Sequence, residues 1–197
     1  MNIVFLTRYN PNDINTWSGT LYHLYNKLKD KHTIKIIGTE ILGQLDSFVK
    51  GNFSVSAFIH GDGYAYGLGR LLSERINALD YDLIFFGDIF FIPLDINIPF
   101  VLLSDLTFEQ ANIHINQSDN RNIEPCIRLE KLILNSSFRI IYCSEWIKRR
   151  VVDIYGIGPG KIEVVEFGAN IPTPTNYSIE INTDICRLVF IGKKWEK

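Results

Sequence analysis

The sequence is poor in cysteine, and the few cysteines it has do not form a framework. Cys126, Cys143 and Cys186 are odd in number, widely spaced and without a CxxC pair. This pattern argues against a disulfide-stabilised secreted domain and against a zinc knuckle. A chain of 197 residues buries enough surface in one domain to fold without such cross-links. The cysteine pattern therefore favours an intracellular protein.

The chain also lacks an excess of charge of either sign and an uninterrupted apolar run. Twenty Lys and Arg against 22 Asp and Glu give a net charge of −2, which excludes a general basic surface for nucleic acid. The most apolar stretch, Ile84 to Leu103, is interrupted by two aspartates and two prolines, unlike the roughly 20 clean apolar residues of a membrane helix. The opening MNIVFLTRYN has no basic region before its short apolar run, unlike a signal peptide. We therefore expect a soluble, cytoplasmic protein.

What the sequence does have is an alternation of short apolar runs with amphipathic stretches. The candidate strands are rich in β-forming apolar residues: 2–7, 33–37, 53–59, 82–86, 99–103, 139–143 and 162–167. The candidate helices have apolar residues three or four apart: 18–28, 68–79, 124–135 and 144–155. Such alternation predicts an α/β fold with a Rossmann-like, doubly wound, mostly parallel sheet.

Several residues predict where these elements begin and end. Ser18 and Ser144 are candidate helix N-caps, Pro125 stands near a helix start and Gly156 follows a helix end. Residues 112–124 are polar and rich in Asn, which predicts a surface loop.

The end of the sequence indicates a second structural unit. The stretch Pro172 to Asp184 has two prolines, polar residues and no periodicity, whereas Arg187 to Gly192 (RLVFIG) is another buried-strand pattern. We expect an N-terminal domain of residues 1–172, a linker of 173–186, and in 187–197 the first strand of a truncated second domain.

Two candidate sites follow predicted strands. Trp17, Ser18, Gly19 and Thr20 stand at a helix start after the first strand, where free N–H groups and a permissive Gly form an anion site; an ordinary helix cap has the same pattern. Asp105 follows the strand 99–103 and could orient a sugar hydroxyl or act as a base, or serve as a turn residue.

A third glycine-rich stretch is weaker. Gly61, Gly63 and Gly67 read G-x-G-x-x-x-G, one residue longer than the dinucleotide fingerprint and far from the first strand. The sequence shows no cluster of carboxylates, so it does not imply a metal ion. It implies no cofactor either.

The motifs WSGT, SDLTF and LEKLILNSSFRIIYCSEWIKRRVVDIYGIGPGKIEVVEFGAN, followed by RLVFIGKKWEK, occur in an order that resembles the N-terminal half of the family-four glycosyltransferases. These are retaining GT-B-type enzymes with two Rossmann-like domains facing across a cleft. The resemblance covers essentially the whole chain and is most specific over Ser144 to Asn170.

The resemblance implies a nucleotide-sugar donor, a sugar or lipid-linked acceptor and no nucleic acid. It implies a role in bacterial surface polysaccharide or glycoconjugate synthesis, with peripheral membrane association of the full-length enzyme. The family's acidic pair for the donor lies beyond residue 197, so we expect residues 1–197 alone to be inactive.

Site residues carry over from the family only where the sequences match. Ser18 and Gly19 match the Gly-Gly pair near the donor phosphate, Lys193 replaces the arginine at the diphosphate, and Asp105 is nearest to a polar catalytic position. The remaining matches line the cleft: Ser144, Glu145, Gly168 and Asn170. Two alternatives stay open, an NAD(P)-binding oxidoreductase that uses the Gly61 region and a binding domain without catalysis.

Overall fold

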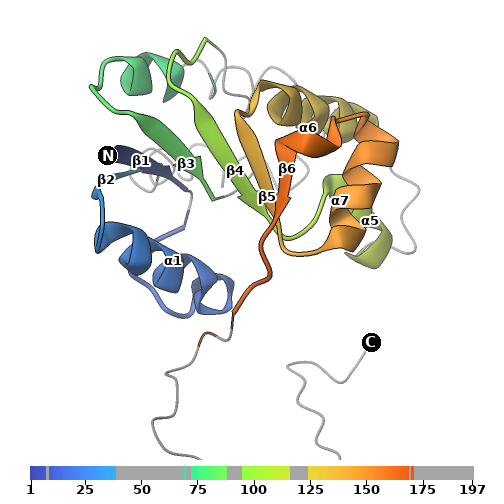
Figure 1. The fold of residues 1–197 in the computed structure, drawn as a ribbon, viewed down its shortest axis with the longest axis horizontal. Helices are drawn as coiled ribbons and strands as arrows, with labels where there is room; N and C mark the ends of the chain where they lie inside the picture. The colour runs from blue at the N-terminus through green and yellow to red at the C-terminus, as the bar shows by residue number, and fades with distance from the viewer. Residues whose placement is uncertain are drawn as a thin grey trace, which may run out of the picture.

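The computed structural model of the chain describes residues 1–7, 9–38, 69, 72–87, 95–115, 124–168 and 170. Within them, six strands form one all-parallel sheet in the order β2-β1-β3-β4-β5-β6 (Figure 1). The strands are β1 (Asn2–Leu6), β2 (Thr33–Ile37), β3 (Leu83–Phe86), β4 (Phe100–Ser104), β5 (Arg139–Tyr142) and β6 (Ile162–Val164). The predicted parallel α/β sheet is confirmed, while the predicted strands 53–59 and 187–192 lie outside the described residues.

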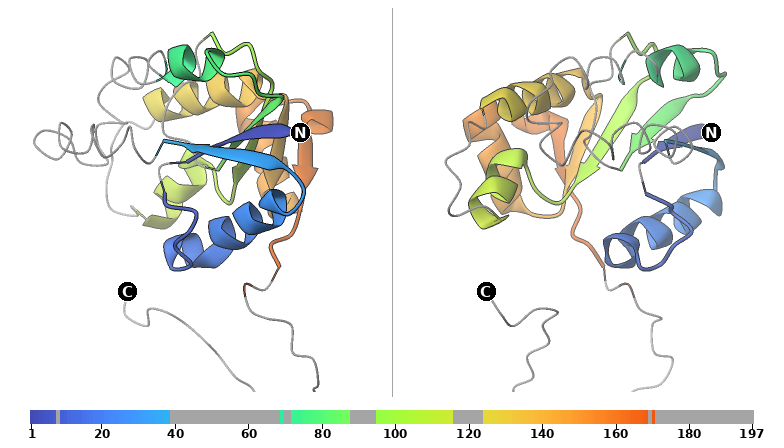
Figure 2. Two further views of the ribbon diagram at one scale, coloured as in Figure 1. Left: turned by 90° about the vertical axis from the view of Figure 1, so that its left-hand side faces the viewer. Right: turned by 180° about the vertical axis from the view of Figure 1, so that it is seen from behind.

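Helices cover both faces of this sheet, as the views in Figure 2 show. The turn η1 (Thr16–Gly19) leads into α1 (Thr20–Lys29), which covers one face. Residues 72–77 and the helices α6 (Glu124–Ser136) and α7 (Glu145–Arg150) cover the other face. Helix α5 is Phe108–Ile115, η2 (Val151–Tyr155) continues α7, and η3 is Pro159–Lys161. A sheet enclosed in this way explains why its strands are apolar on both faces.

Alternate side chains of β1 divide the core between the two faces. Phe5 packs with Tyr25 of α1 and stacks on Phe85 at 5.5 Å between ring centroids. Val4 and Leu6 point into the larger cluster beneath the opposite helices. The period of two residues along a strand produces this division.

The strands run in the same direction, so their carboxyl ends meet along one edge of the sheet. Leu6 of β1 is in register with Ile37 of β2 on one side and with Phe86 of β3 on the other. Strand order reverses between β1 and β3, because the chain first places β2 on one flank of β1 and then builds β3 to β6 on the other. Ligands of open α/β sheets bind outside the carboxyl ends of strands at such a reversal.

Two local predictions are wrong. Residues 112–115, expected in a loop, belong to α5. A reciprocal capping box nucleates that helix, because Thr107 N donates to Gln110 Oε1 (3.1 Å) and Gln110 N donates to Thr107 Oγ1 (3.2 Å). Ser18 is not the N-cap of α1; Gly19 occupies that position, and Ser18 lies in the preceding turn.

The other predicted boundaries agree more closely. Ser144 caps α7 by accepting a hydrogen bond from Ile147 N (3.4 Å), and Gly156 ends η2 with φ of 67°. Strand β6 is shorter than predicted, ending at Val164 instead of 167.

Candidate functional site

The loop that joins β1 to α1 has an unusual backbone at its end. Trp17 (φ 47°), Ser18 (φ 54°) and Gly19 (φ 84°) are three consecutive residues in the left-handed region. Residues other than glycine rarely adopt this conformation, and it persists only where surrounding contacts hold it. We call Trp17–Thr20 the Trp17 loop, and three contacts from distant parts of the chain hold it.

Two of these contacts hold the Trp17 indole. Its Nε1 donates a hydrogen bond to Asp105 Oδ2 at 3.0 Å. Its ring makes an edge contact with Phe167, at 6.0 Å between centroids and 84° between planes, a geometry that aromatic pairs prefer. Asp105 follows β4 and Phe167 follows β6, so the loop is attached to the ends of two other strands.

Asn170 makes the third contact. Its Nδ2 donates to the Ser18 carbonyl oxygen at 2.8 Å and to Thr20 Oγ1 at 3.1 Å. These bonds join residues 150 or more positions apart. The sequence motifs that contain the Trp17 loop, Asp105 and Asn170 therefore meet at the carboxyl edge of the sheet, near the reversal of strand order.

Gly19 is required by the local structure itself. It is buried, and a Cβ added to it would lie 3.3 Å from the Ile14 carbonyl oxygen, 3.4 Å from Asn170 Cβ and 3.5 Å from His23 Cδ2. A side chain would be strained by the positive φ and crowded as well. The positive φ and the close neighbours therefore explain the glycine without a ligand.

The remaining predicted site residues have ordinary surroundings. Ser144 serves as the cap of α7, and Glu145 is exposed in the first turn of that helix. Gly168 is exposed, and a Cβ added there would have no atom of the described residues within 4 Å. Lys193 and the Gly61 region lie outside the described residues.

Cys143 contacts the backbone of Asp105, and its surroundings disfavour the thiolate form. Its Sγ is 3.8 Å from the Asp105 carbonyl oxygen. Burial raises the pKa of Cys143, and the negative charge of Asp105 raises it further. A raised pKa disfavours the thiolate, which is the nucleophilic form.

Sequence reasoning missed a buried carboxyl group that contacts the start of α5. Glu130 of α6 is fully buried and accepts a hydrogen bond from Phe108 N at the start of α5 (3.0 Å to Oε2). The Tyr155 hydroxyl donates to the same carboxyl. Burial raises the pKa of Glu130 to about 8 despite these two bonds. The available signal was a glutamate among the apolar residues of α6, next to Leu129.

Gly38 was also missed. It follows β2 with φ of 119°, and a Cβ there would lie 2.3 Å from the Thr7 carbonyl oxygen. Only glycine lets the carboxyl ends of β1 and β2 approach so closely. A glycine directly after a predicted strand was the signal for it.

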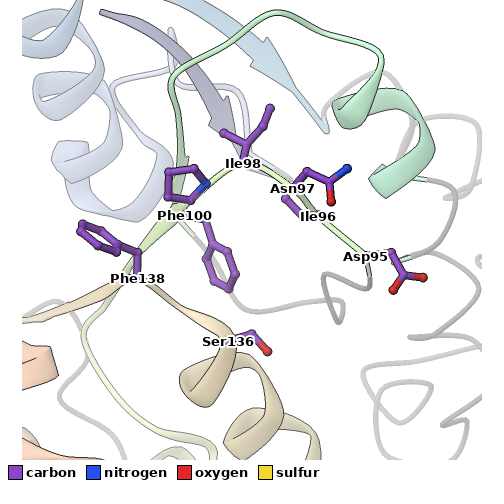
Figure 3. Close-up of a pocket in the computed structure, with 8 residues that line it drawn as sticks. Asp95, Ile96, Asn97, Ile98, Phe100, Ser136 and Phe138 are labelled. Carbon is purple, nitrogen blue, oxygen red and sulfur yellow. The ribbon is translucent and has the colours of Figure 1, made fainter.

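A recess of about 480 Å³ lies elsewhere, at the amino end of β4 (Figure 3). Its walls come from the segment that leads into β4 and from the segment that joins α6 to β5: Asp95, Ile96, Asn97, Ile98, Pro99, Phe100, Ser136 and Phe138. None of the predicted site residues that the structure describes lines it. We place the candidate site at the carboxyl edge, because the motif residues converge there.

Comparisons with known proteins add no assignment: no family model matches the sequence, and a search of curated proteins finds no match. In the described parts of the chain, no group of three or more His, Cys, Asp or Glu side chains is placed to hold a metal ion. None of the described helices is long and apolar enough to cross a membrane.

Proposed function

We propose that the chain is the acceptor-side half of a retaining glycosyltransferase. The full enzyme would move a sugar from a nucleotide-sugar to a hydroxyl group of a sugar or lipid-linked acceptor. The observation that carries the proposal is the meeting of three motifs of the resemblance: Asn170 bonds to the Ser18 carbonyl at 2.8 Å, and Asp105 accepts from the Trp17 indole at 3.0 Å.

The chemistry assigned to this half is binding and orientation. The Trp17 loop leads into the N-terminus of α1, and a helix N-terminus favours the negative charge of a diphosphate. Such fixed dipoles stabilise charge on the departing diphosphate without reorganisation. Resemblance assigns the main donor contacts to residues after 187, and closure of the two halves would exclude water.

The loop after β1 argues against the oxidoreductase alternative. A dinucleotide-binding fold places a tight turn with three glycines directly after its first strand. Here 12 residues separate Leu6 from Gly19, and Gly19 is the only glycine between β1 and α1. The Trp17 loop instead relies on side-chain contacts from Asp105, Phe167 and Asn170.

The test is an amide and indole chemical-shift titration of the chain with common UDP- and GDP-sugars, with NADH as the comparison. We expect millimolar dissociation constants, roughly −4 kcal/mol, with the shifts gathered at the Trp17 loop, Asp105 and Asn170. Tight NADH binding would favour the oxidoreductase. No saturable response to any nucleotide would favour a binding domain without catalysis, and either result contradicts the proposal.

A further inference from the structure

We infer that Asp105 is a positioning residue, which fixes the Trp17 loop through the Trp17 indole and does not transfer a proton in the reaction. This inference rests on the glycosyltransferase function proposed above. It assigns to Asp105 a role different from that of a base, although both roles place the residue at the carboxyl edge of the sheet.

The backbone on either side of Asp105 is held independently of any ligand. The Ser104 hydroxyl donates to the Leu106 carbonyl at 2.8 Å, and the Cys143 thiol is 3.8 Å from the Asp105 carbonyl oxygen. The capping box at Thr107 then fixes the start of α5. Asp105 therefore presents its carboxylate from a rigid connection, as a residue that orients another group must.

The loop on the other side needs such an anchor. Trp17 and Ser18 are in the left-handed region, at φ of 47° and 54°, which residues other than glycine avoid. The bond from Trp17 Nε1 to Asp105 Oδ2 and the Phe167 ring contact hold the indole from two strands. Because Gly19 and Thr20 follow directly, movement of the indole displaces the backbone at the helix start.

The two possible roles of Asp105, as an acceptor that anchors the Trp17 indole and as a base, require different chemical groups. An indole N–H is donor only, and it needs an acceptor oxygen but no negative charge. Asparagine supplies that oxygen and cannot act as a base, whereas leucine has a similar size and supplies neither. Trp17→Phe keeps a ring against Phe167 and removes the donor.

We expect the following in the protein that carries this chain, with sugar-transfer kinetics as the readout. Asp105→Asn keeps kcat/KM within about threefold of the wild type and leaves its pH profile unchanged. Asp105→Leu and Trp17→Phe each lower kcat/KM by at least about tenfold. The double variant that combines Asp105→Leu with Trp17→Phe has a kcat/KM no lower than either single variant, because both substitutions remove the same bond. Trp146→Phe, at an indole 52% exposed on α7, is the matched control and leaves the kinetics unchanged.

A second readout does not depend on transfer. The chain has three tryptophans, and the Trp17 indole resonance is identified by its loss in Trp17→Phe. We expect slow indole hydrogen exchange in the wild type and in Asp105→Asn, and fast exchange in Asp105→Leu. This measurement needs no enzymatic turnover, and it is made on variants that thermal unfolding shows to be folded at the temperature of the experiment, because unfolding itself speeds exchange.

The inference is overturned if Asp105→Asn loses as much activity as Asp105→Leu while Trp17→Phe stays near the wild type. It is also overturned if the Trp17 indole exchanges equally fast in the wild type and in Asp105→Leu. Failure of the proposed function has a different signature, because the wild type itself then neither binds nucleotide-sugars nor transfers sugar.

Discussion

Gly19 and Gly156 both have a positive φ, but the structure requires glycine at the two positions for different reasons. Gly156 has φ of 67°, and among the described residues its added Cβ would meet only Lys131 Nζ, at 3.9 Å. Gly19 has φ of 84°, and its added Cβ would meet backbone and side-chain atoms at 3.3 to 3.5 Å. At Gly156 the backbone conformation alone therefore favours glycine. At Gly19 both the backbone conformation and the close packing favour it.

Alanine substitutions measure these two contributions. Gly156→Ala should lower the free energy of unfolding by roughly 1–2 kcal/mol, the cost of the left-handed conformation. Gly19→Ala should cost more, because the carbonyl of Ile14 must also move. Gly160→Ala is the control, because Gly160 has no positive φ and its added Cβ would have no atom of the described part of the chain within 4 Å; it should leave stability unchanged or slightly raised. Urea unfolding measures all three, and equal values for Gly19→Ala and Gly160→Ala would contradict the packing seen here.

This cost bears on how activity is interpreted at the same position. A Gly19→Val enzyme that loses turnover has also lost stability. The loss then indicates contact with a phosphate only when it is measured per folded molecule. The Trp17 and Asp105 variants avoid this difficulty, since neither adds an atom to the crowded surroundings of Gly19.

Among the elements, the start of α5 depends on a carboxyl group from another helix. Glu130 of α6 accepts from Phe108 N and from the Tyr155 hydroxyl. Burial raises the pKa of Glu130 to about 8, and the charge of nearby Glu109 raises it further. The usual value of 4.5 applies to the unfolded chain, so the folded chain binds one more proton between these two pH values.

Stability should therefore fall as pH rises from about 5 to about 8 through this group, by at most about 1.4 kcal/mol per pH unit. The contribution is fully present below pH 4.5 and lost as pH rises through the folded pKa. Glu130→Gln keeps an acceptor for Phe108 N and cannot ionise, so its unfolding free energy should lack this decline. Urea unfolding at several pH values checks this. Glu163→Gln, an exposed carboxylate on β6, is the control, and parallel curves for Glu130→Gln and the wild type would contradict the assignment.

The elements that the sequence predicted well are those defined by their own residues. Helix α1 shows its apolar spacing at Leu21 and Tyr25, which are both buried, and the cap at Ser144 is a local hydrogen bond. The end of helix α5 was missed because the Asn-rich composition of residues 112–124 outweighed the capping box at Thr107 and Gln110. The Glu130 bonds could not be predicted, because they join three helices and depend on tertiary packing.

Across the whole molecule, the candidate site is a product of sheet topology. The order of β1, β3 and β4 places the Trp17 loop beside Asp105, 88 positions away in sequence. A sequence pattern predicts that both residues follow strands, but it does not predict which strand ends are neighbours. The left-handed Trp17 and its bond to Asp105 therefore had no local signal, whereas the general position at the carboxyl edge did.

The two edges of the sheet should then respond differently to substitution. Phe138 is 57% exposed in the recess at the amino edge, with the Arg139 guanidinium 5.1 Å from its ring. Phe138→Ser removes this exposed cation–π contact, worth about 0.5–1 kcal/mol, and should leave the nucleotide-sugar titration of the Trp17 loop unchanged. Asn170→Ala removes both hydrogen bonds to that loop. It should weaken nucleotide-sugar binding, or spread the chemical-shift changes beyond the Trp17 loop.

Both variants are compared by the same chemical-shift titration, with thermal unfolding as the check that each is folded. The comparison distinguishes the two edges, because Phe138 and Asn170 lie at opposite ends of parallel strands that form one sheet. A ligand held by the Trp17 loop is sensitive to the orientation of Ser18 and Thr20, which Asn170 fixes, and is insensitive to the recess. If Phe138→Ser abolishes the response while Asn170→Ala preserves it, the ligand binds at the amino edge, and the convergence of motifs at the carboxyl edge is structural alone.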